Sequence, residues 1–119
     1  MKKFRRTQGQ DGRLLFFWRL DYQRDMQRVM IIGAPGSGKS TLARIIADRM
    51  GLPVFHMDQI HWKPGWVPRE EEQKVPMVMT IIDQDKWGFE GGHSRTYKDR
   101  LHRADTVIWL DLPLPLRFF

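Results

Sequence analysis

With 119 residues, of which 41% are hydrophobic and 29% charged, the chain is long enough for one globular domain, and no apolar run in it is long enough to cross a membrane. The absence of cysteine excludes disulfides, zinc–thiolate sites and a thiol nucleophile, and it suits the reducing cytoplasm. The net charge of +6 comes mostly from residues 1–28, where eight Lys and Arg accompany three Asp, so the rest of the chain lacks the strongly basic surface typical of nucleic-acid-binding domains.

Residues 1–25 differ from the rest of the chain. A basic start at Lys2–Arg6 leads to a short apolar run at Leu14–Trp18, which is too short for a signal peptide. We interpret residues 1–25 as a basic, poorly ordered N-terminal extension that the domain at 26–119 does not need for its stability. A short membrane- or nucleic-acid-binding arm is the alternative interpretation.

From Arg28 onward, short apolar runs alternate with segments of helical character. We expect residues 59–68 to form a loop, and we expect Pro76 to break or restart the helix that contains it. Alternating strands and helices predict an α/β fold, in which helices cover both faces of a parallel sheet. The predicted strands are Val29–Ile32, Pro53–Met57, Trp87–Glu90 and Thr106–Leu110, and the predicted helices are Ser40–Met50, Arg69–Asp83 and Thr96–Arg103.

The segment Gly33–Ser40 fits the phosphate-loop pattern G-x-x-x-x-G-K-[ST] at every fixed position. It lies between a predicted strand and a predicted helix, so its backbone N–H groups and the helix N-terminus favour phosphate oxygens. We expect Lys39 to reach the β- and γ-phosphates of ATP and the Ser40 hydroxyl to ligate Mg²⁺. The predicted nucleotide-binding residues are Gly33, Ala34, Pro35, Gly36, Ser37, Gly38, Lys39, Ser40 and Thr41.

Ligands of parallel α/β sheets bind at the carboxyl ends of the strands, where several acids of this chain lie. Glu90 ends a predicted strand, and we expect it to hold Mg²⁺ together with Ser40. Asp111 competes for this role because it also follows an apolar strand. Each of the two acids could instead cap a helix.

Two further residues at this edge are predicted to act in catalysis with Lys39. We expect Asp58 to contact the hydroxyl of a phosphate acceptor or a magnesium-bound water, and Arg95 to clamp a phosphate. The alternatives are an Asp58 that accepts bonds from loop N–H groups and a solvent-exposed Arg95. The spacing of His56, Asp58 and His61 also fits a transition-metal site, which we consider a weaker interpretation than Mg²⁺.

Four stretches together resemble small adenylate-kinase-like P-loop proteins, which are often labelled topology modulation or DNA topology modulation proteins. The resemblance runs from about Met26 to the end of the chain. The stretches are Gln27–Ala43, Asp58-x-x-x-Trp62-x-x-x-Trp66, Trp87-x-x-Glu90-Gly91-x-x-Ser94-Arg95 and Ala104–Pro113.

The resemblance implies a three-layer α/β/α P-loop NTPase fold like that of nucleoside-monophosphate kinases. It also implies phosphoryl transfer from ATP with Mg²⁺, and an acceptor site built by the segment after the second strand. Two features depart from this family: Glu90-Gly91 stands where Asp-Gly is usual, and the chain stops at Phe119. We therefore expect the last strand and the arginine-bearing lid to be missing, which would leave the edge of the fourth strand unpaired.

Three functions remain open on the sequence. The leading hypothesis is a small-molecule or nucleotide kinase that uses ATP and Mg²⁺. The second is a nucleic-acid-linked regulatory ATPase in which residues 1–28 form a basic arm. The third is a catalytically inactive nucleotide-binding fragment.

Overall fold

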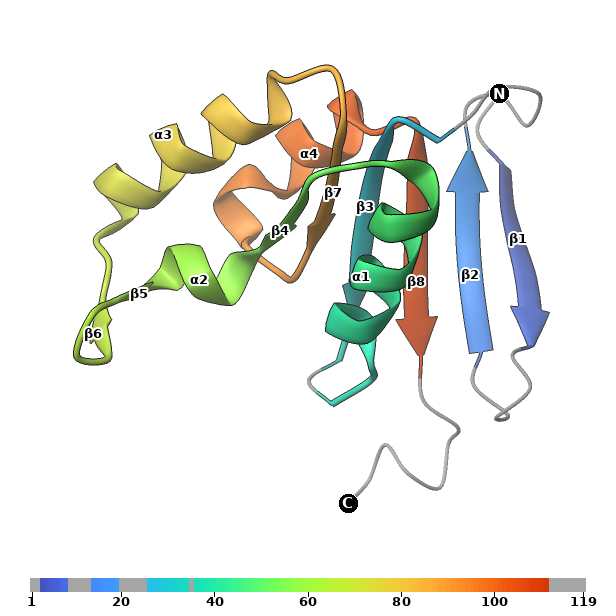
Figure 1. Cartoon of the computed structure of the whole chain (residues 1–119), viewed down its shortest axis with the longest axis horizontal. Helices are drawn as coiled ribbons and strands as arrows, with labels where there is room; N and C mark the ends of the chain where they lie inside the picture. The colour runs from blue at the N-terminus through green and yellow to red at the C-terminus, as the bar shows by residue number, and fades with distance from the viewer. Residues whose placement is uncertain (1–2, 9–13, 20–25, 35, 112–119) are drawn as a thin grey trace.

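A six-stranded mixed sheet, in the order β1-β2-β8-β3-β7-β4, runs through the molecule (Figure 1). The structure, a computed structural model, describes residues 3–8, 14–19, 26–34 and 36–111, and side chains only within 26–110. Strands β8, β3, β7 and β4 are parallel, as predicted, whereas β2 is antiparallel to β8 and β1 is antiparallel to β2. The strands are β1 Lys3–Gln8, β2 Leu14–Arg19, β3 Arg28–Gly33, β4 Val54–His56, β7 Trp87–Glu90 and β8 Thr106–Asp111.

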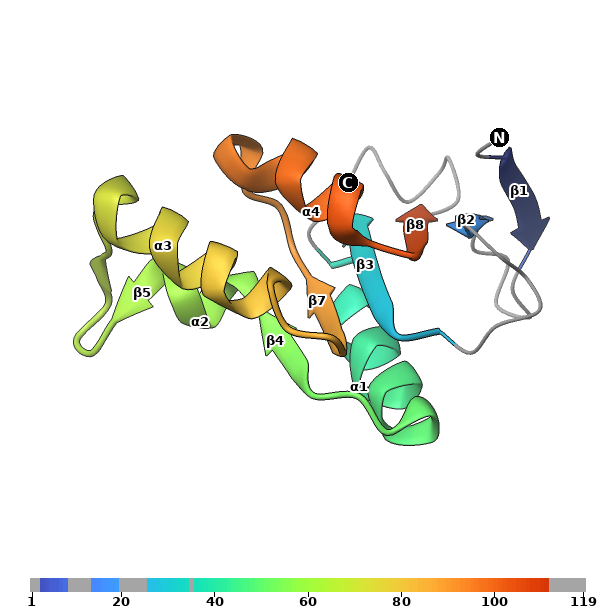
Figure 2. The same ribbon diagram turned by 90° about the horizontal axis from the view of Figure 1, so that it is seen from above.

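Helices cover both faces of the parallel part of the sheet (Figure 2). Helix α1 lies on one face, and helices α3 and α4 lie on the other, so the predicted three-layer α/β/α fold is confirmed. No helix within the described ranges is long and apolar enough to cross a membrane. The helices are α1 Lys39–Met50, α2 Met57–His61, α3 Glu71–Ile82, the 3₁₀ helix η1 Ser94–Thr96 and α4 Tyr97–Arg103.

Alternation along the central strands divides the apolar side chains between two cores. In β3, Met30 packs on the face of α3, while Val29 and Ile31 pack on the face of α1. In β8, Val107 packs on the face of α3, and Ile108 packs on the face of α1. Both faces of the central strands are therefore buried, which explains why they read in the sequence as continuous apolar runs.

The N-terminal segment adds two strands that the sequence analysis does not predict. Strand β2 pairs with β8 from Leu14 opposite Asp111 to Arg19 opposite Thr106, and β1 pairs in turn with β2. The edge of β8 is therefore paired, and the expectation that it would be open is wrong. The division of the chain at residues 25 and 26 stays a prediction.

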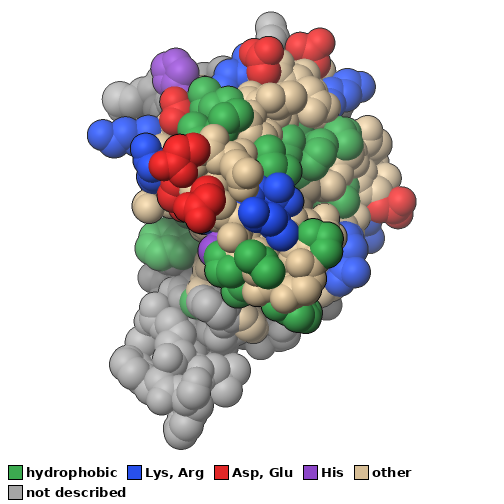
Figure 3. Space-filling model, turned by 90° about the vertical axis from the view of Figure 1, so that its left-hand side faces the viewer, with side chains coloured by type: hydrophobic (Ala, Val, Ile, Leu, Met, Phe, Trp, Pro, Cys, Tyr) green, Lys and Arg blue, Asp and Glu red, His purple; other side chains and the backbone are tan. Residues whose placement is uncertain are grey.

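The segment after β4 is more ordered than the loop predicted for residues 59–68. It begins with α2, in which Met57 and Ile60 are buried, and continues into a small hairpin of β5 (Trp62–Lys63) and β6 (Val67–Pro68). The turn carries Trp66 at φ 59°, and its side chain is 79% exposed. On the side of the molecule that carries this hairpin and α3, hydrophobic side chains form separate groups among charged ones (Figure 3).

Helix α3 continues through Pro76, so the predicted break is wrong. Proline removes one backbone hydrogen bond and crowds the preceding turn. Here Lys74, Val78 and Ile82 are buried at intervals of four residues along one face of the helix. Burial of this face against the sheet outweighs the cost of one proline, which is itself exposed.

Candidate nucleotide-binding site

The phosphate loop connects β3 to α1, as the pattern predicts. Gly36 has φ 76° and Gly38 has φ 91°, conformations that glycine adopts without the steric cost of a side chain. The Ser37 N–H donates to the Ala34 carbonyl at 3.1 Å, which closes the turn, and Gly38 is the N-cap of the 12-residue helix α1. The loop therefore ends at a helix N-terminus, where phosphate is favoured. Pro35 lies outside the described residues.

Gly33 is required by close packing. A Cβ atom on Gly33 would overlap the backbone carbonyl oxygen of Leu110 in β8 and would lie 2.8 Å from Ser37 Oγ. The first glycine of the loop therefore lets β8 and the buried Ser37 approach the end of β3.

The structure places Ser40 beside Glu90, and their predicted role as partners of one Mg²⁺ stays a prediction. The Ser40 hydroxyl donates to Glu90 Oε1 at 3.0 Å. Glu90 ends β7, the direct neighbour of β3, and is only 3% exposed. Asp111 ends β8, and its side chain lies outside the described residues.

His56 is a second partner of Glu90, a contact that no motif in the sequence predicts. Its Nδ1 lies 2.8 Å from Glu90 Oε1, because β4 and β7 pair in parallel with His56 opposite Glu90. His61 has a different partner, the Lys74 ammonium, so the two histidines of the predicted metal spacing take part in different contacts. The signal for His56 in the sequence is its place at the end of a strand.

A cavity of about 450 Å³ opens at the phosphate loop and is lined by Gly36, Gly38, Lys39, Ser40 and Asp58. Asp58 reaches it from the exposed side of α2, so the structure brings two of the three predicted catalytic residues to one cavity. Arg95 is exposed in η1 and does not line this cavity. Loop N–H groups, a lysine, a hydroxyl and a nearby carboxylate form a donor set that fits a nucleoside polyphosphate with Mg²⁺.

A polar network joins α2, α3 and the segment after β7. Glu71, in the first turn of α3, forms an ion pair with Lys74 at 2.6 Å and a hydrogen bond with His93 Nε2 at 2.8 Å. The hydrogen bonds from Lys74 and then from His93 lower the pKa of Glu71 to about 2. Lys74 also lies 3.2 Å from His61 Nδ1, so the network connects the end of α2 to the loop beyond Glu90.

Arg100 supports that loop from within the core. Its guanidinium donates to the carbonyls of Gly91 at 2.7 Å and His93 at 3.2 Å, and it lies over the Phe89 ring. Burial disfavours the charged form and lowers the pKa of Arg100 to about 10. Gly91 has φ 108°, and a Cβ there would lie 2.7 Å from Met57 Cβ, so the chain turns sharply beneath α2.

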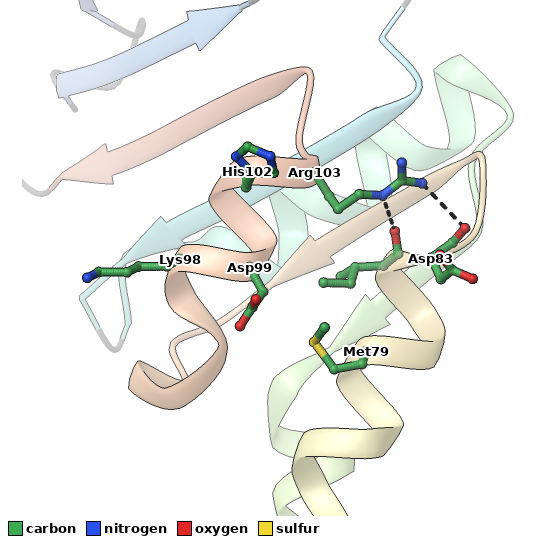
Figure 4. A pocket seen from close by; sticks show the side chains of 7 residues that line it. Met79, Asp83, Lys98, Asp99, His102 and Arg103 are labelled. Atoms are coloured by element: carbon green, nitrogen blue, oxygen red, sulfur yellow. Dashed lines mark hydrogen bonds between the residues drawn. The ribbon is translucent and has the colours of Figure 1, made fainter.

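A second cavity of about 380 Å³ lies between α3 and α4, away from the phosphate loop (Figure 4). Arg103 crosses it and donates to the carbonyls of Ile82, Asp83 and Gln84 at the end of α3. None of the predicted site residues lines this cavity, whose lining is Met79, Ile82, Asp83, Lys98, Asp99, His102 and Arg103.

Comparison with known proteins finds one family and two partial relatives. The family described as "ATPase family associated with various cellular activities (AAA)" matches residues 29–111. A probable gluconokinase from Schizosaccharomyces pombe (strain 972 / ATCC 24843) is 28% identical over 60 residues, 50% of this chain and 28% of that protein. The ATP-dependent zinc metalloprotease FtsH of Ralstonia pickettii (strain 12J) is 30% identical over an alignment of 70 residues, 50% of this chain and 10% of that protein. The chain thus spans less than a third of the length of either relative, and no solved structure matches it significantly.

Proposed function

The chain belongs to the ATPase family associated with various cellular activities, and from this premise we propose that it transfers the γ-phosphoryl group of ATP, with Mg²⁺, to a small-molecule or nucleotide acceptor. The observation that carries the proposal is the cavity that Asp58 shares with Lys39 and Ser40. It places a carboxylate from the segment after β4 beside the phosphate loop. The narrower resemblance to adenylate-kinase-like proteins agrees with this proposal and stays a prediction.

In this proposal the phosphate loop holds the nucleotide. Loop N–H groups bind phosphate oxygens, Lys39 contacts the β- and γ-phosphates, and the Ser40 hydroxyl and Glu90 hold Mg²⁺. When bound, Mg²⁺ neutralises charge that develops on the phosphate oxygens. Ser40 can offer an oxygen lone pair to the metal while its hydrogen still points to Glu90, so the contact seen at 3.0 Å is compatible with metal binding.

Asp58 is proposed to orient the acceptor. The acceptor hydroxyl donates to the Asp58 carboxylate, which takes up the proton as the acceptor oxygen bonds to the γ-phosphorus. The bond from that phosphorus to the β–γ bridging oxygen breaks, and ADP leaves. The similarity to a protein named as a probable gluconokinase supports a polyhydroxy acid as one acceptor to test. Arg95 stays a predicted phosphate clamp, because it lies outside the cavity lining.

A nucleic-acid-linked ATPase is the second candidate. The excess of Lys and Arg in residues 1–28 and the similarity to the ATP-dependent protease FtsH favour it over a purely passive nucleotide-binding domain. In that case water, rather than an acceptor hydroxyl, takes the phosphoryl group, and DNA raises the rate of turnover.

The two candidates separate in one assay of ADP formation from Mg·ATP. The additions are gluconate and other polyhydroxy acids, nucleoside monophosphates, and double-stranded DNA at two salt concentrations. A kinase forms ADP faster with one small acceptor and releases the phosphorylated acceptor. Stimulation by DNA alone, lost at high salt, would replace the proposal with the second candidate, and no turnover with any addition would contradict both.

Asp58→Asn is the matched variant for this assay. We expect it to lower the acceptor-dependent rate by about 10²–10⁴-fold, as expected when a general base is removed. Asp48→Asn, at an exposed position of α1 outside the cavity lining, is the control and should keep the wild-type rate. Equal rates in Asp58→Asn and the wild type would exclude Asp58 as the acceptor base.

A further inference from the structure

Glu90 is a buried carboxylate with its two donors on the same oxygen. Ser40 Oγ, from the first turn of α1, and His56 Nδ1, from β4, both contact Oε1, at 3.0 Å and 2.8 Å. Within the described part of the chain, Oε2 makes no hydrogen bond. The arrangement fixes the carboxylate through one oxygen and leaves the second available.

The donor and acceptor roles in this contact follow from the chemistry of the groups. An ionised carboxylate only accepts hydrogen bonds, so its contact with His56 requires a hydrogen on Nδ1, which His56 then donates to Glu90 Oε1. The ring is mostly buried, with 16% of the side chain exposed, and it lies in the strand next to β7, in register with Glu90. Burial and strand pairing therefore hold His56 beside Glu90.

We propose that His56 is a positioning residue of the magnesium site, which orients the Glu90 carboxylate so that Oε2 is presented to Mg²⁺ or to a water bound to it. The inference rests on the proposed function. It assigns to the end of β4 a role that neither the phosphate-loop pattern nor the spacing of His56, Asp58 and His61 indicates.

The physical reason for such a residue lies in the length of the glutamate side chain. Glutamate has three rotatable side-chain bonds, and fixing them costs conformational entropy each time a metal must be bound. If a hydrogen bond already fixes the side chain in the folded protein, this entropy is lost on folding and not on metal binding. Partners of metal ligands typically contribute about 10–100-fold to metal affinity for this reason.

Two substitutions of His56 test the inference, one that keeps a hydrogen-bond donor for Glu90 and one that removes it. His56→Asn places an amide nitrogen near the position of Nδ1 and can still donate to Glu90. His56→Leu has no donor but retains a side chain of similar size at this mostly buried position. The control is His102→Leu, since His102 is exposed on α4 and lines the other cavity.

The measurement is titration calorimetry of ADP in Mg²⁺ and in EDTA. Because Mg²⁺ held by Ser40 and Glu90 would neutralise charge on the phosphate oxygens, we expect it to tighten ADP binding by the wild-type protein. His56→Leu should lose about 10-fold or more of this magnesium-dependent gain, with ADP binding in EDTA unchanged. His56→Asn and His102→Leu should keep most of it, while Glu90→Gln should lose at least as much as His56→Leu.

Three outcomes would overturn the inference. An unchanged magnesium-dependent gain in His56→Leu shows that Glu90 needs no such support. An equal loss in Mg²⁺ and in EDTA shows that His56 only stabilises the fold. If the wild-type protein binds no ADP under either condition, the proposed function fails, and the inference fails with it.

A second measurement uses the wild-type protein and is independent of whether His56→Leu folds. Proton–nitrogen NMR of the imidazole rings reports which ring nitrogen carries hydrogen. We expect His56 to carry hydrogen on Nδ1, with a signal that moves in Glu90→Gln. An Nδ1 without hydrogen cannot donate to Glu90, and this result would also overturn the inference.

Discussion

Gly33 has no room for a side chain, because the Leu110 carbonyl and Ser37 Oγ occupy the position of a Cβ atom. We expect Gly33→Ala to force the backbone of β8 or of the phosphate loop to shift. Overpacking of this kind typically costs about 1–3 kcal/mol, which lowers the melting temperature of a domain this size by roughly 5 °C or more. Thermal unfolding followed by circular dichroism measures this change.

Gly88→Ala is the matched control for Gly33→Ala. Gly88 lies in the neighbouring buried strand, and a Cβ there would meet only the Pro53 carbonyl oxygen, at 3.9 Å. The melting temperature of the Gly88→Ala variant should stay close to that of the wild type. Equal decreases in melting temperature in the two variants would show that the close contacts at Gly33 do not cause the loss of stability.

At the scale of single residues, the phosphate loop could be predicted because the residues that bind phosphate lie close together in the sequence. Lys39 and Ser40 follow from the pattern alone, and the proximity of Glu90 follows from the rule that strand ends share one edge. The contact of His56 with Glu90 could not be predicted in the same way. It depends on the register of two strands whose partners are 34 positions apart, which no local pattern encodes.

At the scale of elements, Glu71 ties α3 to the loop after β7, and this contact depends on pH. The pKa of Glu71 in the folded protein is about 2, below the ordinary value of 4.5. The stabilisation from Glu71 is therefore complete above about pH 4.5 and is lost as the pH falls toward about 2. Lys74 and His93 are the titratable groups that contact it.

Glu71→Gln tests this dependence. We expect the variant to have a lower free energy of unfolding than the wild type at about pH 5. The difference in this free energy between the two proteins should be smaller at about pH 2.5. Urea unfolding at both pH values measures it, with Glu72→Gln, an exposed neighbour in the same turn, as the control. A difference of the same size at both pH values would mean that Glu71 acts through something other than its charge.

Elements with local signals could be predicted from the sequence, and elements held by distant contacts could not. Helix α1 ends at Met50, as predicted, and its C-cap Gly51 adopts φ 68°, a left-handed conformation in which glycine commonly ends a helix. Helix α3 passes through Pro76 because its buried face packs on the sheet, and that packing depends on residues far along the chain. The β5–β6 hairpin was missed because each strand has only two residues, too few to show an alternating pattern.

At the scale of the whole molecule, the N-terminal strands complete one side of the sheet. Deletion of residues 1–25 removes β1 and β2 and leaves the backbone groups of β8 unpaired at an edge. We expect the shortened protein to melt several degrees lower and to self-associate, contrary to the sequence-based expectation that the segment adds no stability. Thermal unfolding and sedimentation velocity measure the two effects.

Deletion of residues 1–8 is the control for this truncation. It removes β1 but keeps β2 on the edge of β8, so it should have the smaller effect. If removal of 1–25 and of 1–8 changes the melting temperature equally, the pairing of β2 with β8 contributes nothing measurable. In that case, the sequence-based interpretation of the segment would stand.

The central claim is that the edge formed by the phosphate loop, Glu90 and Asp58 binds a nucleotide, and titration calorimetry of Mg·ADP tests it most directly. The wild-type protein should bind one nucleotide per chain. Lys39→Ala removes a charge-assisted contact worth about 1.5–3 kcal/mol, so affinity should fall at least ~10-fold, while Lys98→Ala on α4 should bind like the wild type. Equal affinity of the wild type and Lys39→Ala would contradict the claim and place the nucleotide elsewhere.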